Sequence, residues 1–260
     1  MHTTTLKELS SGLRRIELGS EPVVFMHSNL FPLGLLEKGV VGLYGLLLEW
    51  LGPDSTLLMP AFSYHNNPDK PWECNRTAAK TGALTEYFRK QQHVLRSVHP
   101  IHSVSAYGKY AQHFTSDIDV SSFGEKSPFA KLYQCNAHNI SIGTGLVGGA
   151  TYLHYIEELL KVPYRSYVKI PVAVFDANES KVDREFVYFA RVVVDSLEYV
   201  NVWDNVWADL SVAGAFTTFE IGPAKIVHSK MRDSADLFAD KIRENPYYCA
   251  QRVDNVQLNL

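Results

Sequence analysis

Residues 139–158, NISIGTGLVGGATYLHYIEE, decide the fold that we predict for this chain. The stretch 139–143 (NISIG) is apolar and β-branched enough for a buried strand, and it enters a glycine-rich turn. Thr151 is the expected N-cap of a helix over residues 151–161. A strand, a glycine-rich turn and a helix start can hold an anion or an acyl group, because N–H groups at a helix N-terminus lack backbone partners.

His154 is the candidate general base in this segment. It lies one turn after Thr151 on the same face of the predicted helix, and Glu157 and Glu158 follow three and four residues later. An imidazole beside a carboxylate can accept a proton near pH 7. The alternative is a surface histidine beside unrelated acidic residues, and the spacing alone favours this alternative.

Strands and helices alternate before this segment. We expect strands over residues 22–26 and 54–61, helices over 6–18, 37–50, 82–92 and 109–115, and a further helix start capped by Ser127. The runs 168–175, 186–194 and 216–221 have no predicted helices between them and are typical of antiparallel strands, before a last helix over 229–243. The chain is therefore predicted to be one α/β domain, residues 1–260, with a β-rich portion at about 165–225.

A second segment, RSVHPIHSV (residues 96–104), gathers chemically active side chains around one proline. His99 and His102, with His65 or His113, could bind a metal. Alternatively, Arg96, Ser97 and Ser103 could hold a phosphate. An HxxH pair without a carboxylate or cysteine at a defined spacing is a weak metal signal, so we predict no metal site.

Composition excludes several classes of protein. The chain has 260 residues and a net charge of −3, and it shows no basic patch for nucleic acid. Its three cysteines form no disulfide framework, and no apolar run is long enough to span a membrane, so we expect a cytoplasmic protein. There is no GxGxxG, Walker, GxSxG or HExxH motif.

Five blocks, in this order, resemble the aminoglycoside 3-N-acetyltransferase family, also called the antibiotic N-acetyltransferase fold. They are PVVFMHSNLFPLGLLEKGV (22–40), LGPDSTLLMPAFSYH (51–65), TGALTEYFRK (81–90) with LRSVHPIHSVSAYG (95–108), FGEKSPFAKL (123–132) and ISIGTGLVGGATYLHYIEE (140–158). The histidine–proline block is similar to the family's R-S-x-H-P-x-H-S-V pattern. The last block is similar to its G-x-G-x-x-x-x-T-x-L-H-x-x-E pattern. The blocks extend over most of the chain.

The resemblance implies a central mixed sheet flanked by helices and an acetyl-CoA-dependent N-acetyltransferase that needs no metal. His154 matches the family's catalytic histidine, and Thr151 would lie beside the thioester and stabilise the oxyanion. The resemblance also implies residues that line the donor channel, and we add Arg96 and His102 from the same block. The predicted donor-binding residues are Ser28, Leu30, Arg96, Ser97, His102, Ser103, Val104, Ser127 and Phe129.

The expected acceptor is an amino sugar, which the β-rich portion would help to bind. The family's aminoglycoside enzymes carry an acidic stretch after the catalytic helix, whereas this chain has YFARVVVDSLEYV (residues 188–200). Asp195, Glu198 or Glu157 could orient His154. The few carboxylates favour a nucleotide-linked or cell-surface amino sugar over an aminoglycoside antibiotic.

Two other functions fit the sequence. A non-catalytic relative would bind CoA or a sugar as a sensor, and a metal-dependent hydrolase would use His99 and His102. No nucleic acid or membrane partner is expected. A homodimer is compatible with the sequence, which does not fix the oligomeric state.

Overall fold

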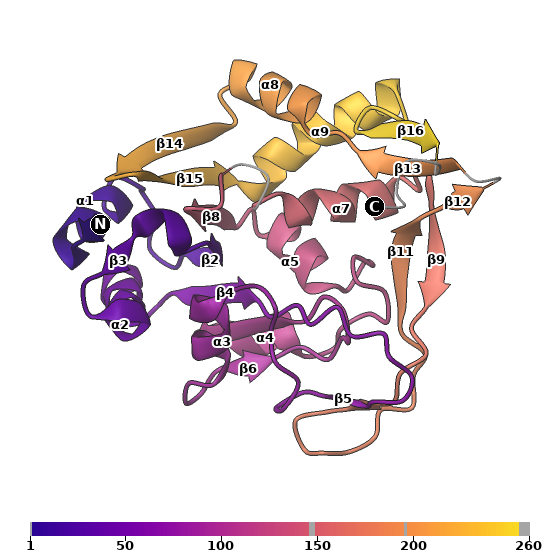
Figure 1. The fold of residues 1–260 in the computed structure, drawn as a ribbon, viewed down its shortest axis with the longest axis horizontal. Coiled ribbons are helices and arrows are strands. Elements are labelled where there is room, and N and C mark those ends of the chain that lie inside the picture. The colour runs from indigo at the N-terminus through magenta and orange to yellow at the C-terminus, as the bar shows by residue number, and fades with distance from the viewer. Residues whose placement is uncertain (1, 146–148, 195–196, 255–260) are drawn as a thin grey trace.

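The computed structural model describes residues 2–145, 149–194 and 197–254 and is built around a seven-stranded mixed sheet (Figure 1). β8, β2 and β4 are parallel to one another, and every other neighbouring pair in the sheet is antiparallel. The strand order is β14 (Phe216–Ile221), β15 (Ala224–Lys230), β8 (His138–Ile142), β2 (Val23–Ser28), β4 (Thr56–Pro60), β7 (Val104–Gly108) and β6 (Leu95–Arg96).

The central strands β2 and β4 are buried on both faces, which explains their nearly continuous apolar sequences. Val24 and Met26 of β2 belong to one hydrophobic cluster, whereas Phe25, which points to the other face, belongs to a second. The first cluster is completed by side chains of α1 (Leu6–Leu13), α2 (Gly39–Leu51) and α3 (Ala83–Arg89). The second is completed by side chains of α4 (Ala111–Thr115), α5 (Pro128–Gln134), α7 (Leu153–Leu159) and α9 (Met231–Glu244).

Smaller sheets lie outside the central one. β9 (Arg165–Lys169) pairs with β11 (Val187–Arg191), and β13 (Leu197–Asn201) lies between β12 (Val193–Val194) and β16 (Ala250–Asp254). Two short parallel pairs are β1 (Thr3–Thr4) with β3 (Leu35–Leu36) and β5 (Trp72–Glu73) with β10 (Val174–Phe175). β9 and β11 run side by side beyond the C-terminal end of α7 (Figure 1).

The predicted α/β fold with a central mixed sheet is confirmed, but its C-terminal part was predicted only in part. α8 (Asp204–Val212) interrupts a region where we expected no helix; its buried Val206 and Leu210 have the spacing of a helix face. β14 was expected in the β-rich portion, but it joins the central sheet by pairing with β15, a strand that the sequence did not reveal.

The two expected helix caps had opposite outcomes. The Oγ atom of Ser127 accepts the N–H of Ala130 and caps α5, as predicted. Thr151 was wrongly predicted as a cap, because it lies inside a 3-10 turn (Ala150–Tyr152) from which the chain passes directly into α7. Tyr152, the residue before α7, already has helical backbone angles, so no non-helical capping residue is needed there.

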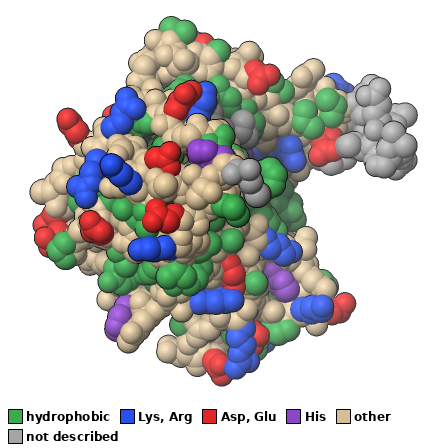
Figure 2. Space-filling model, turned by 60° about the vertical axis from the view of Figure 1, so that its left-hand side comes forward, with side chains coloured by type: hydrophobic (Ala, Val, Ile, Leu, Met, Phe, Trp, Pro, Cys, Tyr) green, Lys and Arg blue, Asp and Glu red, His purple; other side chains and the backbone are tan. Residues whose placement is uncertain are grey.

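Charges of both signs are interspersed on the face of the molecule shown in Figure 2. No helix among the described residues has the length and apolar character needed to cross a bilayer.

Candidate active site

The centre of the candidate site is a histidine–carboxylate pair on α7. The Nδ1 atom of His154 is hydrogen-bonded to Oε2 of Glu157, one helical turn later. The Glu157 side chain is fully buried, whereas that of His154 is 25% exposed. A carboxylate on Nδ1 favours the tautomer with the proton on Nδ1, which leaves the Nε2 lone pair available as a base.

Glu157 is held by a second set of donors that the sequence analysis did not predict. Its Oε1 accepts from the Tyr164 hydroxyl at 2.6 Å and from Nε of Arg165 at 3.1 Å. Nη2 of Arg165 also donates to Oδ1 of Asn201 at 3.1 Å. These residues come from the start of β9 and the end of β13, so only the folded chain brings them to α7.

Electrostatics keep Glu157 ionised. Burial raises the pKa of this carboxyl group, but the charge and hydrogen bond of His154 and the charge of Arg165 lower it more, to about 2. The site therefore pairs an ionised carboxylate with an imidazole. When an imidazole acts as a general base it becomes an imidazolium, and a neighbouring carboxylate stabilises that positive charge.

This shift predicts how stability depends on pH. The pKa of Glu157 is about 2 in the folded protein, against an ordinary value of 4.5, so its ionised form stabilises the folded state at pH values above 4.5. That contribution is lost as the pH falls from about 4.5 to 2. The difference in the free energy of unfolding between the wild type and Glu157→Gln, measured by urea titration, is expected to shrink over this interval. A difference in the free energy of unfolding that stays constant between pH 4.5 and 2 would contradict this prediction.

His154 lines a cavity of about 650 Å³, which we call the acceptor cavity. Its walls combine aromatic side chains with polar and charged groups, a composition suited to a sugar. The lining residues include Tyr64, His102, Phe123, His154, Arg165, Tyr188, Phe189, Arg191, Glu198, Asn201 and Trp203.

A second cavity of about 560 Å³, the donor cavity, lies at the carboxyl ends of β2 and β4. The parallel neighbours of β2 lie on its two sides, β4 on one and β8 on the other, so the strand order changes direction at β2. Ligands in open α/β sheets bind at the carboxyl ends of the strands at such a switch point. Tyr64 lines both cavities, so the two adjoin. Thr151 lines the donor cavity and His154 the acceptor cavity.

The donor cavity has groups that suit a phosphate-bearing thioester. Lys80 supplies a cation to its wall, and Ser28 and Thr144 supply hydroxyls. His27 also lines it, and Nε2 of this buried ring has no hydrogen-bond partner among the described residues. Burial lowers the pKa of His27 to about 3, so the ring is neutral and can bond to a ligand.

The structure separates the predicted donor-binding residues into three groups. Ser28 and Leu30 line the donor cavity, whereas His102 lines the acceptor cavity. The other six line neither cavity, and the polar side chains among them bond to other parts of the protein. These six are Arg96, Ser97, Ser103, Val104, Ser127 and Phe129.

Arg96 illustrates the third group, the residues that line neither cavity. Its guanidinium donates to the carbonyls of Ala61, Cys74 and Thr77 at 2.6–2.9 Å and to Oγ of Ser103 at 3.0 Å. These bonds join three segments around the loop that carries β5.

Arg96→Ala is expected to destabilise the fold by about 3 kcal/mol, because three partly buried carbonyls lose their donor. The KM for the acyl donor should stay unchanged at temperatures where the variant is folded. Thermal unfolding and donor kinetics together check this. A variant with wild-type stability and a raised KM would instead make Arg96 a donor-binding residue.

The other carboxylates proposed to orient His154 are placed differently from Glu157. Glu198 lines the acceptor cavity, with no hydrogen bond to His154 in the described part of the chain. Asp195 lies outside the described residues. Among the three candidates, Glu157 is the one seen in contact with the imidazole.

The two histidines of the HxxH pair considered for a metal, His99 and His102, are engaged within the protein. Nδ1 of His99 accepts the backbone N–H groups of Ile101 and His102, so it offers no lone pair to a metal. Nδ1 of His102 is hydrogen-bonded to Oγ of Ser122 at 2.8 Å. Within residues 2–145, 149–194 and 197–254, no three potential ligands gather in one place.

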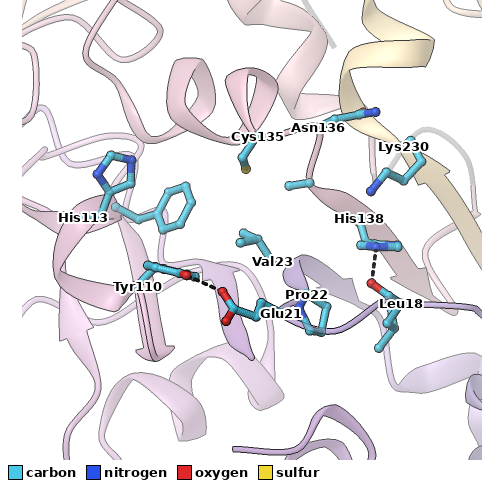
Figure 3. Close-up of a pocket in the computed structure, with 12 residues that line it drawn as sticks. Leu18, Glu21, Pro22, Val23, Tyr110, His113, Cys135, Asn136, His138 and Lys230 are labelled. Atoms are coloured by element: carbon cyan, nitrogen blue, oxygen red, sulfur yellow. Dashed lines mark hydrogen bonds between the residues drawn. The ribbon is translucent and has the colours of Figure 1, made fainter. Parts of the chain in front are cut away.

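A further cavity of about 520 Å³ lies at the opposite end of the central strands, where β2 and β8 begin (Figure 3). Cys135 points into it, and Nε2 of His138 bonds to the carbonyl of Leu18 at 3.1 Å. None of the predicted site residues lines it.

Fold and site together define an α/β protein in which a histidine–glutamate pair borders one of two adjoining cavities. The family model described as "Aminoglycoside 3-N-acetyltransferase" matches residues 25–243, and the chain belongs to this family.

Relatives carry the name of this family, and a solved structure has the same fold. Aminoglycoside N(3)-acetyltransferase IV from Salmonella sp is 30% identical over 154 residues, which are 57% of this chain and 58% of that protein. Aminoglycoside N(3)-acetyltransferase VII from Streptomyces paromomycinus is 25% identical over 264 residues, covering 90% of this chain and 89% of the relative. The structure of AAC-IIIb in binary complex with CoASH superposes with a TM-score of 0.79 at 22% identity, covering 93% of this chain and 97% of that one.

Proposed function

We propose that the protein transfers an acetyl group from acetyl-CoA to an amine of an amino sugar, with His154 as general base. The observation that carries the proposal is the His154–Glu157 pair on the wall of a cavity that adjoins the donor cavity. Family membership supports the acetyl donor and the amine acceptor, because the matched relatives are named for that reaction.

The amine must lose a proton before or during its attack, because an ammonium ion has no lone pair. His154 takes this proton on Nε2, the nitrogen forms a bond to the thioester carbonyl, and the carbon–sulfur bond then breaks. The released thiolate takes up a proton, from the imidazolium or from water. Glu157 stabilises the transient imidazolium, as a triad carboxylate does.

Thr151 is proposed to stabilise the negative oxygen that develops on the carbonyl. Its side chain belongs to the donor cavity and precedes His154 by three residues. A hydroxyl there can donate to an oxyanion formed between the two cavities. The geometry needs no covalent intermediate, since the base and both substrates can meet directly at the junction.

Aromatic side chains support an amino sugar as the acceptor. Trp203 packs edge-on against the His154 ring with centroids 5.7 Å apart, and Phe123 does so at 5.5 Å. With Tyr64 and Phe189 they give the cavity flat apolar walls against which a sugar ring can lie. Aminoglycosides, nucleotide-linked amino sugars and cell-surface amino sugars remain the proposed acceptors, and a cytoplasmic location and a homodimer stay predictions.

Release of free thiol from acetyl-CoA, measured over a panel of these acceptors, tests the proposal. We expect acceptor-dependent release and micromolar to millimolar KM values, as for most enzymes. CoA binding by calorimetry without release for any acceptor would indicate a sensor. Release that a chelator abolishes, or that needs no acceptor, would indicate a hydrolase.

A further inference from the structure

The acceptor cavity carries an arginine that the reaction itself does not use. Arg191 ends β11 and lies directly opposite Arg165 of β9 in the antiparallel ladder. Side chains at opposing positions point to the same face of a sheet, and like charges placed so repel each other. Both residues line the acceptor cavity.

The two arginines differ in how their charge is balanced. Arg165 donates to buried Glu157, to Asn201 and to the carbonyl of Phe189, so its charge and its donors are engaged. Arg191 is exposed and has neither an ion pair nor a side-chain hydrogen bond within the described residues. Its guanidinium is therefore available to a ligand.

Carboxylates are scarce on the same walls. Glu198 is the one acidic residue in the described lining of the cavity. Glu157 does not line the cavity; its side chain is fully buried and bonded to Arg165 and His154. Within the described lining, a polycation that entered would meet the unpaired guanidinium of Arg191 and a single accessible carboxylate, that of Glu198. Repulsion between like charges disfavours such an acceptor.

We propose that the natural acceptor is an amino sugar that also bears an anionic group, held by Arg191 while its amine reaches His154. This inference rests on the proposed function and narrows its substrate class. A guanidinium binds phosphate and carboxylate through paired N–H donors, with a preference for planar or tetrahedral oxyanions over neutral hydroxyls. Phosphate is the group we favour, because its higher charge gives the larger attraction.

The test compares one amino sugar in four forms: free, as a phosphate monoester, linked to a nucleoside diphosphate, and oxidised to the uronic acid. A polycationic aminoglycoside is the fifth acceptor. For the wild type we expect kcat/KM to be at least about tenfold higher for a phosphate-bearing form than for the free sugar, in keeping with a charge-assisted contact. The monoester and the nucleotide form distinguish the two sources of phosphate.

Arg191→Ala should remove this preference mainly through KM, and Arg191→Glu should reverse it. Arg252→Ala is the matched control, because Arg252 is an exposed arginine on β16 that does not line the cavity. It should behave like the wild type. An aminoglycoside as the best wild-type acceptor, or a preference that survives Arg191→Ala, would overturn the inference.

Measurements of sugar binding without turnover test the anion site independently of the proposed acetyl transfer. Calorimetry with His154→Ala and CoA measures affinity for the free and phosphorylated sugars without turnover. Tighter binding of the phosphorylated form, lost when Arg191→Ala is added, would support the anion site even if no acceptor were acetylated. Equal affinities for both forms would reject it even if acetyl transfer were observed.

Discussion

His154→Ala is expected to lower kcat/KM by about 10³-fold, within the range that a positioned general base contributes. The reason is that Nδ1 of this ring is already bonded to Glu157, which leaves Nε2 as the proposed proton acceptor in the acceptor cavity. Affinity for CoA should be nearly unchanged, because His154 does not line the donor cavity. Steady-state kinetics and CoA titration measure both quantities.

His113→Ala is the matched control for this substitution. His113 is an exposed histidine on α4 that lines the cavity at the opposite end of the central strands (Figure 3). Its replacement should leave both kcat/KM and CoA affinity at the wild-type values. Wild-type turnover by His154→Ala would show that another group, or water alone, takes the proton.

Replacing Glu157 is expected to affect both stability and catalysis. Glu157→Ala leaves the Arg165 guanidinium, only 10% exposed, without its carboxylate, so the free energy of unfolding should fall by about 3–5 kcal/mol. Glu157→Gln keeps the size of the side chain but removes its charge, and kcat/KM should fall by about 10²-fold or more as the imidazolium loses its stabilising partner.

Glu158→Gln provides the comparison for Glu157→Gln. Glu158 is the next residue on the same helix and is also buried, but it bonds to Ser121 at 2.8 Å and Tyr167 at 3.2 Å rather than to His154. Its replacement should cost stability without a comparable fall in kcat at temperatures where it is folded. Equal kinetic losses in both variants would mean that Glu157 acts only through the fold.

Much of the N-terminal architecture could be predicted from local sequence. The strands VVFM and TLLMP are buried on both faces, so their continuous apolar sequences predict strands in the centre of the sheet. The pairing of His154 with Glu157 was also predictable, because a separation of three residues places both on one face of a helix.

Contacts between distant segments could not be predicted in this way. Arg165 reaches Glu157 and Asn201 only after β9, α7 and β13 have packed together, and Arg96 joins segments up to 35 residues apart. A buried carboxylate on a helix requires a cation. That requirement makes Arg165, the next arginine in the chain, a candidate partner of Glu157. The spacing of the two residues, however, matches no local structure that would have predicted their contact.

The measurement that tests the account most directly is mass spectrometry of the acceptor after incubation with acetyl-CoA and either the wild type or His154→Ala. The account predicts an N-acetylated amino sugar with the wild type and about 10³-fold slower formation of the same product with the variant. If both proteins form it at the same rate, or if the wild type binds CoA but acetylates no amine, the assignment of His154 as the base of an N-acetyltransferase is contradicted.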